Sequence, residues 1–256
     1  MSRKCFLISA VLAVVLSACA LSGAKAEYTY FDDFNKELNQ TWWTMSSSGS
    51  VAASYVTDIT NTSNKLILMK YTLDPGGPLP GEGSLKLNFP IQGNFSASIT
   101  YNLYNWPTPD NDAGISIATN LGEVERISDT TELYLTDFVG DVTHSISTSD
   151  MQGRLRIIRN GTILQGCYYD PTISGDNKWL LISQYNNVSA ADTNITISLW
   201  PGGDTDKGFA VIFDDFNLHA YDAKDPRGVV PEPASMLLFG VGAAAMAVIK
   251  RRKKNT

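Results

Sequence analysis

The chain has 256 residues, of which 43% are hydrophobic and 10% aromatic, and its formal net charge is -6. The charge is uneven: residues 27–228 hold 12 basic and 25 acidic side chains, a net charge of -13, whereas both ends of the chain are basic. Such an acidic region repels a phosphate backbone, which excludes sequence-independent nucleic-acid binding, and the apolar content excludes intrinsic disorder.

Residues 1–26 have the pattern of an export signal peptide. A short basic region precedes an apolar run, and Ala24-Lys25-Ala26 forms a small-x-small cleavage site. Leu16-Ser17-Ala18-Cys19 also fits the pattern that precedes a lipid-modified cysteine in bacterial lipoproteins. Cleavage after Ala26 and lipidation of Cys19 are therefore alternative predictions.

Residues 27–222 predict a domain built from strands. Apolar residues recur at every second position within 84–89, 95–103, 155–157 and 195–199, which is the pattern of half-buried strands. Turn-like clusters separate these runs, and Asn160-Gly161 indicates a two-residue hairpin. About a dozen strands at this spacing predict an all-β fold, a two-sheet antiparallel β-sandwich or jelly roll.

One five-residue pattern occurs near both ends of this domain. Phe31-Asp32-Asp33-Phe34-Asn35 is matched by Phe213-Asp214-Asp215-Phe216-Asn217. Because no further similarity follows, a tandem repeat is disfavoured. We expect an opening and a closing strand that lie side by side in one sheet.

These end segments also carry a resemblance to a known fold. The opening 31–34 with Leu38-Asn39 and Trp42, the run 153–162 with Trp179 downstream, and the closing run 209–216 resemble concanavalin A-like lectin and glucanase domains. The resemblance covers nearly the whole of the domain. It implies a jelly-roll sandwich, and it implies either glycan binding or glycan hydrolysis.

The catalytic pattern of such glucanases is broken in this chain. Their two carboxylates lie on one face of one strand, as acid and nucleophile. The nearest match is Glu123-Val124-Glu125-Arg126-Ile127, in which Ile127 occupies the next position on that face. A solvated strand face accounts better for Glu123 and Glu125, so we assign no catalytic residue. We expect Cys167, the only cysteine between 27 and 228, to be buried rather than reactive.

Two further groups of residues are candidates for binding. Tyr104-Asn105-Trp106 and Tyr168-Tyr169 with Trp179 combine aromatic faces with polar side chains, as sugar recognition requires. Core packing is the alternative for each of these aromatic residues. Asp110 and Asp112 offer paired oxygens in a turn-rich loop, so a structural calcium ion is a possible cofactor, with ordinary turn chemistry as the alternative.

The C-terminus has three parts in a fixed order. Pro231-Glu232-Pro233 precedes 234–249, sixteen uncharged and mostly apolar residues, and then five consecutive basic residues at 250–254. The apolar part predicts a short transmembrane helix whose basic end stays in the cytoplasm. A plain tail anchor would account for these two parts.

The complete order resembles the PEP-CTERM sorting signal of Gram-negative bacteria. The resemblance implies recognition by a membrane-embedded exosortase, cleavage near Pro231-Glu232-Pro233, and delivery to the cell surface or the extracellular matrix. Hosts of such proteins typically make exopolysaccharide.

The chain is therefore expected to consist of a signal peptide (1–26), a β-sandwich domain (27–222), a linker (223–230) and a sorting signal (231–254) with its transmembrane segment at 234–249. The function predicted first is an exported, non-enzymatic protein that binds extracellular polysaccharide. A glycoside hydrolase of the same fold and a purely structural matrix protein are the alternatives.

Overall fold

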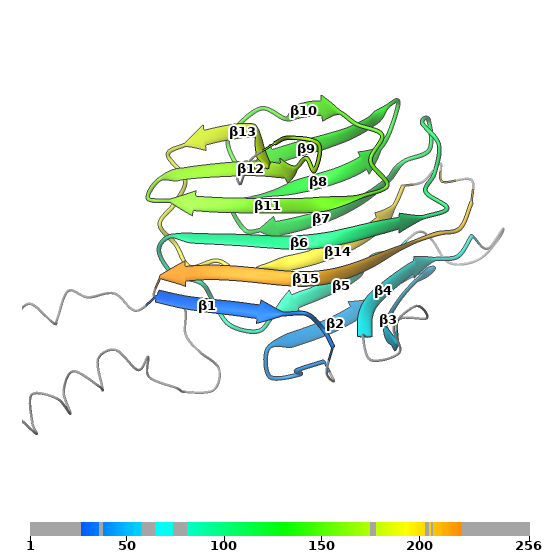
Figure 1. Cartoon of the computed structure of the whole chain (residues 1–256), viewed down its shortest axis with the longest axis horizontal. Helices are drawn as coiled ribbons and strands as arrows, with labels where there is room; N and C mark the ends of the chain where they lie inside the picture. Colours follow the sequence, from blue (N-terminus) through cyan, green and yellow to red (C-terminus); the bar gives the residue numbers. More distant parts are fainter. Residues whose placement is uncertain are drawn as a thin grey trace, which may run out of the picture. The chain divides into compact units, whose positions relative to one another are not determined.

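The computed structural model describes residues 27–221, apart from 36–37, 58–64, 74–80, 175–177, 203–204 and 206. One compact unit spans Tyr28–Arg227, and its described part is built entirely from strands and their connections. The strands form two antiparallel sheets that lie one over the other (Figure 1). The predicted all-β sandwich is therefore confirmed.

The first sheet, sheet A, has the order β13-β12-β11-β6-β15-β4-β3, with β1 paired to β15. Its strands are β1 (Glu27–Asp32), β3 (Val51–Thr57), β4 (Lys65–Tyr71), β6 (Phe95–Tyr104), β11 (Gln152–Asn160), β12 (Ile163–Tyr169), β13 (Trp179–Asn186) and β15 (Phe209–Tyr221).

The second sheet, sheet B, has the order β10-β9-β8-β7-β14-β5-β2. Its strands are β2 (Trp43–Ser47), β5 (Gly83–Leu87), β7 (Ala113–Thr119), β8 (Gly122–Ser128), β9 (Glu132–Phe138), β10 (His144–Ser147) and β14 (Thr196–Pro201).

The alternation in the sequence decides which side chains form the core. In β6 the residues at 95, 97, 99, 101 and 103 are at most 3% exposed, whereas Thr100, Asn102 and Tyr104 between and after them point away from the core. Ile195, Ile197 and Leu199 are likewise fully buried. Successive side chains of a strand point to opposite faces, so one face of each sheet is left for binding.

The two ends of the domain meet as expected. β1 and β15 are paired in sheet A; the repeated five-residue pattern begins at the end of β1 and lies within β15. Phe34 and Phe216 are both buried and both pack against the Trp43 ring, whose Nε1 donates a hydrogen bond of 2.9 Å to Asp32 Oδ2. The repeated aromatic residues therefore close one end of the core.

The predicted hairpin between β11 and β12 is also present, one residue further along than expected. Asn160 is paired with Ile163, so Gly161 and Thr162 form the two-residue turn. Gly161 has a φ of 62°, and Thr162 is not in the left-handed region. A positive φ at the first turn residue alone fits a type II′ turn, which requires glycine there.

The predicted signal peptide, linker and sorting signal lie outside the described residues. Within the described ranges, no helix is long and apolar enough to cross a membrane. The cleavage site, the alternative lipidation at Cys19 and the transmembrane segment at 234–249 therefore stay predictions.

Candidate functional site

A groove runs over the outer face of sheet A. It has a volume of about 1010 Å³ and is lined from β3, β4, β6, β11, β12 and β15. Residues that face each other on paired strands form rows across the groove. In one row, Ile212 lies opposite Asn102, and Asn102 lies opposite Gln152. In the next row, Asp214, Thr100 and Arg154 are paired in the same way. We call this feature the sheet A groove.

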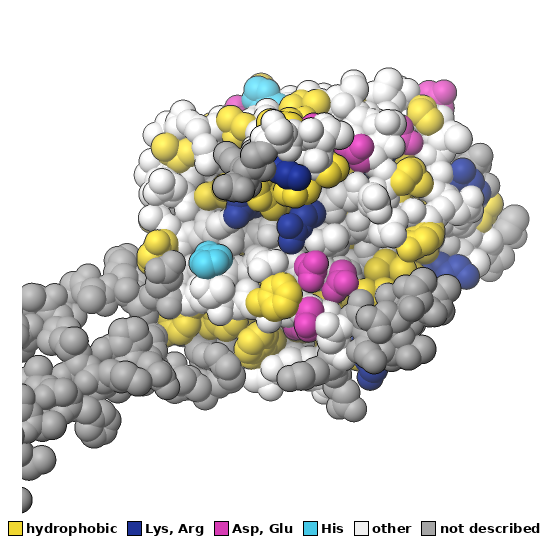
Figure 2. Space-filling model, viewed as in Figure 1, with side chains coloured by type: hydrophobic (Ala, Val, Ile, Leu, Met, Phe, Trp, Pro, Cys, Tyr) yellow, Lys and Arg dark blue, Asp and Glu magenta, His cyan; other side chains and the backbone are white. Residues whose placement is uncertain are grey.

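The groove has an apolar side and a polar side. Leu66, Leu68 and Ile212 line it on β4 and β15, whereas Asn102 and Arg154 line it on β6 and β11. Figure 2, viewed in the same direction as Figure 1, shows basic side chains gathered over β11 and acidic side chains over β15. A ligand with one apolar and one polar face would match this surface.

Two arginines and two aromatic rings pack together at the polar side, where Arg154 and Tyr169 line the groove and Arg156 and Trp179 lie next to them on the same face of the sheet. Arg154 and Arg156 both lie on the outer face of β11, two positions apart. The guanidinium carbon of Arg154 is 5.6 Å from the Tyr169 ring centroid, and that of Arg156 is 4.5 Å from the Trp179 ring centroid. Arg154 Nε also donates a hydrogen bond of 3.1 Å to the Thr100 hydroxyl. We call Arg154, Arg156, Tyr169 and Trp179 the arginine–aromatic cluster.

Burial shapes the electrostatics of this cluster. It lowers the pKa of Arg156, and the neighbouring Arg154 charge lowers it further, although a guanidinium stays charged in proteins. Cys167, which is paired with Arg156 across the strands, is buried as expected, and burial raises the pKa of its thiol. The cluster is thus a cationic site with a neutral neighbour.

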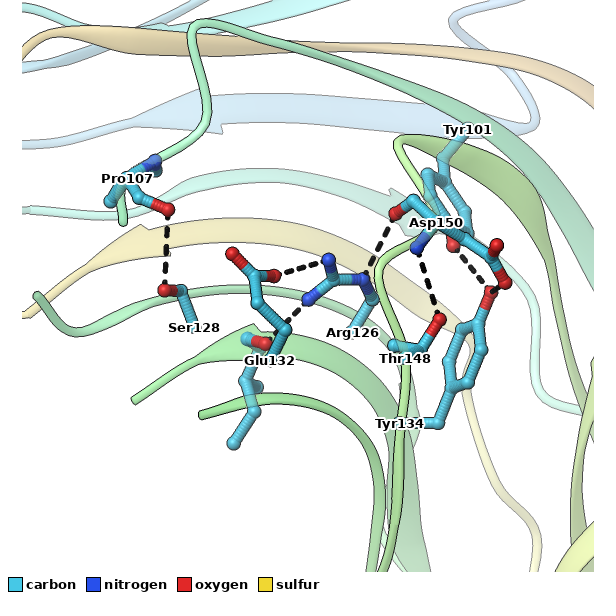
Figure 3. Close-up of polar contacts among 9 residues, drawn as sticks. Tyr101, Pro107, Arg126, Ser128, Glu132, Tyr134, Thr148 and Asp150 are labelled. Atoms are coloured by element: carbon cyan, nitrogen blue, oxygen red, sulfur yellow. Dashed lines mark hydrogen bonds and ion pairs between the residues drawn. The ribbon is translucent and has the colours of Figure 1, made fainter. Parts of the chain in front are cut away.

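A buried network fixes the start of β11. Tyr101 and Tyr134 point toward each other between the sheets, with their hydroxyls 2.9 Å apart, and Tyr134 donates a hydrogen bond of 2.9 Å to Asp150 Oδ2 (Figure 3). Burial raises the pKa of Tyr101 to about 12, so both hydroxyls keep their protons. The Asp150 carbonyl also accepts a hydrogen bond from Arg126 Nε. These hydrogen bonds on the core side therefore fix the segment that leads into Arg154.

The first predicted aromatic group is split by a turn. Tyr104, the last residue of β6, is 46% exposed and lines the groove. Asn105 has a φ of 51°, and its side-chain amide donates a hydrogen bond to the Gly208 carbonyl. Because this left-handed residue ends the strand alternation, Trp106 turns inward and packs edge-on against Phe209. Trp106, predicted as a glycan contact, is a core residue.

The second predicted group is divided between the two faces of sheet A. Tyr168 packs on the core side, where its ring stacks on Tyr134 at a centroid distance of 4.4 Å. Tyr169 and Trp179 point to the outer face, with ring centroids 5.5 Å apart. The structure brings Tyr104 and Tyr169 to one groove and keeps Tyr168 out of it.

The calcium prediction falls on the loop before β7. Asp110 has a φ of 74°, and the Asp112 carbonyl accepts hydrogen bonds from the Gly202 amide and the Thr205 hydroxyl. In the described part of the chain, no three His, Cys, Asp or Glu side chains gather where they could hold a metal ion. Calcium also binds amide and backbone carbonyl oxygens, which this finding does not cover, so calcium stays a prediction.

The candidate acid pair lies on the other sheet. Val124 is buried in the core, so Glu123 and Glu125 share the outer face of β8 in sheet B. Burial, together with the neighbouring Glu123 carboxylate, raises the pKa of Glu125 to about 8. The Trp200 indole donates a hydrogen bond of 3.3 Å to Glu125 Oε1. These carboxyls and the sheet A groove thus lie on different sheets.

Comparisons with known proteins identify the C-terminal segment. Residues 229–253 match the family model of the PEP-CTERM protein-sorting motif. This motif implies export, sorting to the cell surface and processing by an exosortase. The search of curated proteins finds no match to the chain.

Solved structures identify the fold. The CBM2 module of the evolved Dit protein of Lactobacillus casei BL23 phage J-1 is 10% identical, over 78% of this chain and 99% of that chain, with a TM-score of 0.53. Peanut lectin with a nine-residue peptide is 10% identical, over 78% of this chain and 99% of the lectin chain, with a TM-score of 0.52.

A third structure comes from work on the endo-acting O-glycanases with which human gut microbiota initiate mucin breakdown. It is 12% identical, over 75% of this chain and 99% of that chain, with a TM-score of 0.52. At these identities the likeness concerns the fold alone. The domain has the two-sheet sandwich fold of peanut lectin and of these other structures, in agreement with the fold that the resemblance of its end segments implied.

Proposed function

We propose that this chain is an exosortase-processed bacterial surface protein whose sandwich domain binds a glycan in the sheet A groove without cleaving it. Before processing, the C-terminal segment would hold the chain in the membrane, and the ligand would be an extracellular polysaccharide. The sorting motif supports the location, and the groove supports the binding.

The observation that carries the proposal is the composition of the groove. Tyr104 and Tyr169 lie at its polar side together with the amide of Asn102, and the leucines of β4 form its apolar side. A sugar ring has an apolar face that packs on aromatic and aliphatic surface, and hydroxyls that bond to amides and hydroxyls. A groove about 1010 Å³ in volume has room for several sugar rings.

The test uses the protein recovered from producing cells, applied to a glycan array and to polysaccharide pull-downs. Tyr169→Ala should weaken binding about five- to tenfold, because one stacking surface is lost. Tyr221→Ala, at the exposed end of β15, is the matched control and should bind normally. Absence of binding to every polysaccharide would favour a purely structural matrix protein instead.

A second candidate function is glycoside hydrolysis, which is favoured by the shared face of Glu123 and Glu125. A retaining hydrolase needs two carboxyl groups about 5–5.5 Å apart, one of them protonated near neutral pH. The raised pKa of Glu125 satisfies the second condition. Release of reducing ends that disappears in Glu125→Gln would establish this function, and binding without release would reject it.

Mass spectrometry of the exported protein tests the processing of both ends. Cleavage near Pro231-Glu232-Pro233 is expected to remove the predicted transmembrane segment. The N-terminal mass distinguishes a free Glu27 from a lipid-bearing Cys19. An exported chain that keeps its C-terminus would contradict processing by an exosortase.

A further inference from the structure

The arginine–aromatic cluster is a local positive site on an acidic domain. Among the described residues, neither Arg154 nor Arg156 forms an ion pair. Their cross-strand neighbours in sheet A are Thr100, Ser98 and Cys167, none of which carries a carboxylate. Two adjacent guanidinium groups without a counter-ion among the described residues would attract a negatively charged ligand.

One donor of this cluster is both buried and unused. Arg156 Nε has less than 1 Å² of accessible surface and no hydrogen-bond partner in the described structure. A buried donor without an acceptor is destabilising, and more so when it is charged. Because the atom is not accessible, a ligand oxygen would reach it only after the Arg156 side chain shifts, and that hydrogen bond would then remove the cost.

The rings orient the guanidinium groups toward such a ligand. Each guanidinium lies over an aromatic face, at 4.5 Å for Arg156 and 5.6 Å for Arg154. Stacking does not use the N–H groups at the edge of the guanidinium plane. Arg154 Nε is bonded to the Thr100 hydroxyl and Arg156 Nε is buried, so the terminal N–H groups are the ones that would match the two oxygens of a carboxylate. The rings therefore hold the arginines in place without occupying their donors.

Asp214 sets the direction of the ligand across the groove. It lies on the opposite side of Thr100 from Arg154, in the same row of the sheet. A carboxylate on the ligand is attracted to β11 and repelled from β15. Hydroxyl-bearing and apolar parts of the ligand would then lie over β15 and β4, where Ile212 and Leu68 line the groove.

We infer that the sheet A groove takes an acidic glycan, one whose sugar rings bear carboxylates as uronic acids do, and that Arg154, which lines the groove, and the adjacent Arg156 bind the carboxylate. This inference rests on the proposed glycan-binding function and gives its substrate class. A dense polyanion is disfavoured, because residues 27–228 carry a net charge of -13. A carboxylate on a sugar ring carries less charge per length and matches a site of two cations.

The test compares two forms of one ligand by isothermal titration calorimetry on the exported protein. Oligogalacturonate carries free carboxylates, and its methyl-esterified form has the same sugar rings without the charge. We expect the acid form to bind at least about tenfold more tightly, with an affinity that falls as salt is raised. Equal affinities would overturn the inference while leaving the proposed glycan binding intact, and no binding of any array glycan would overturn both.

Substitutions test whether Arg156 causes the preference for the acid form. Arg156→Gln should remove the preference for the acid form, and Arg156→Lys should keep only part of it, because lysine lacks the planar fork. Lys70→Gln removes an exposed base from β4 of the same sheet and should leave the preference unchanged. A urea unfolding curve confirms that each variant is folded. A preference that survives in folded Arg156→Gln, or equal binding of a sulfated glycan, would contradict a carboxylate site at this position.

Discussion

The guanidinium of Arg156 lies over the indole of Trp179, 4.5 Å from the ring centroid, and joins two strands that are not adjacent in sheet A. β12 lies between them and contributes Cys167 and Tyr169 to the same face. Packing across three strands fixes a long side chain that is otherwise free in solution. The cationic side chain is thus held in position without a ligand.

This contact should be measurable as a coupling energy. In a double-mutant cycle of Arg156→Gln and Trp179→Leu, urea unfolding should give a coupling of about 0.5–1 kcal/mol, because the cation–π contact is partly exposed. A control cycle of Lys70→Gln with Trp179→Leu should give no coupling. If the first cycle also gives none, the contact does not hold Arg156.

The buried hydroxyl network next to β11 leaves no room for a methyl group at Gly153, so we expect such a group to lower the stability of the fold. A Cβ on Gly153 would lie 2.8 Å from the Tyr101 hydroxyl and 3.1 Å from the Tyr134 hydroxyl. Gly153→Ala should therefore destabilise the fold by about 1–3 kcal/mol in urea unfolding.

Removing the nearer hydroxyl provides the control for Gly153→Ala. In a Tyr101→Phe background the closest clash is absent, so the added cost of Gly153→Ala should fall. An equal cost in both backgrounds would show that the hydroxyl pair does not oppose the methyl group.

We expect the loss of a buried ion pair at Arg126 to lower the stability more than the loss of an exposed pair at His144. The Arg126 side chain is fully buried and pairs with Glu132, whereas His144 pairs with Asp141 at 3.6 Å and is 45% exposed. Glu132→Gln leaves a buried charge without its partner and should cost about 3 kcal/mol. Asp141→Asn should cost less than about 1 kcal/mol. Similar costs by urea unfolding would contradict the burial of Arg126.

Glu125 predicts a pH-dependent stability. Its pKa is raised to about 8 by burial, so the folded protein binds a proton that the unfolded chain releases above its ordinary carboxyl pKa. The free energy of unfolding should therefore be highest at the acidic end of the window and fall as the pH rises from about 5 to 8. At about 1.4 kcal/mol for each pKa unit, the total is a few kcal/mol.

Glu125→Gln should flatten this dependence, because glutamine does not titrate. Asp129→Asn, which changes an exposed carboxylate beyond the end of β8, is the control and should keep the slope. Chemical denaturation at several pH values measures both. A stability of the wild-type protein that rises with pH across this window would contradict the burial of Glu125.

The sequence was sufficient to predict the all-β fold and several of its strands. Alternation is a local property, so the inward face of β6 could be assigned from residues such as Ile99 and Leu103 alone. The pairing of β1 with β15 could be predicted because the same five-residue pattern begins at the end of β1 and recurs within β15. The C-terminal sorting motif is a contiguous pattern and needs no fold to be found.

The groove could not be predicted, because it depends on which strands become neighbours. Arg154 and Arg156 form a site only where β12 and β13 bring Tyr169 and Trp179 beside β11. Alternation alone implies that Trp106 faces outward, and the positive φ of Asn105 instead turns it into the core. Bases at alternate positions of one strand, in a strongly acidic domain, were the one local signal that could have indicated the site.

Hydrogen–deuterium exchange of the exported protein with and without oligogalacturonate tests the central claim most directly. Binding in the sheet A groove should slow exchange in peptides from β11, β12 and β13, around Arg156, Tyr169 and Trp179. Peptides from β8 and β14 should be unaffected. Protection confined to β8, around Glu125, would place the ligand on sheet B and contradict the account.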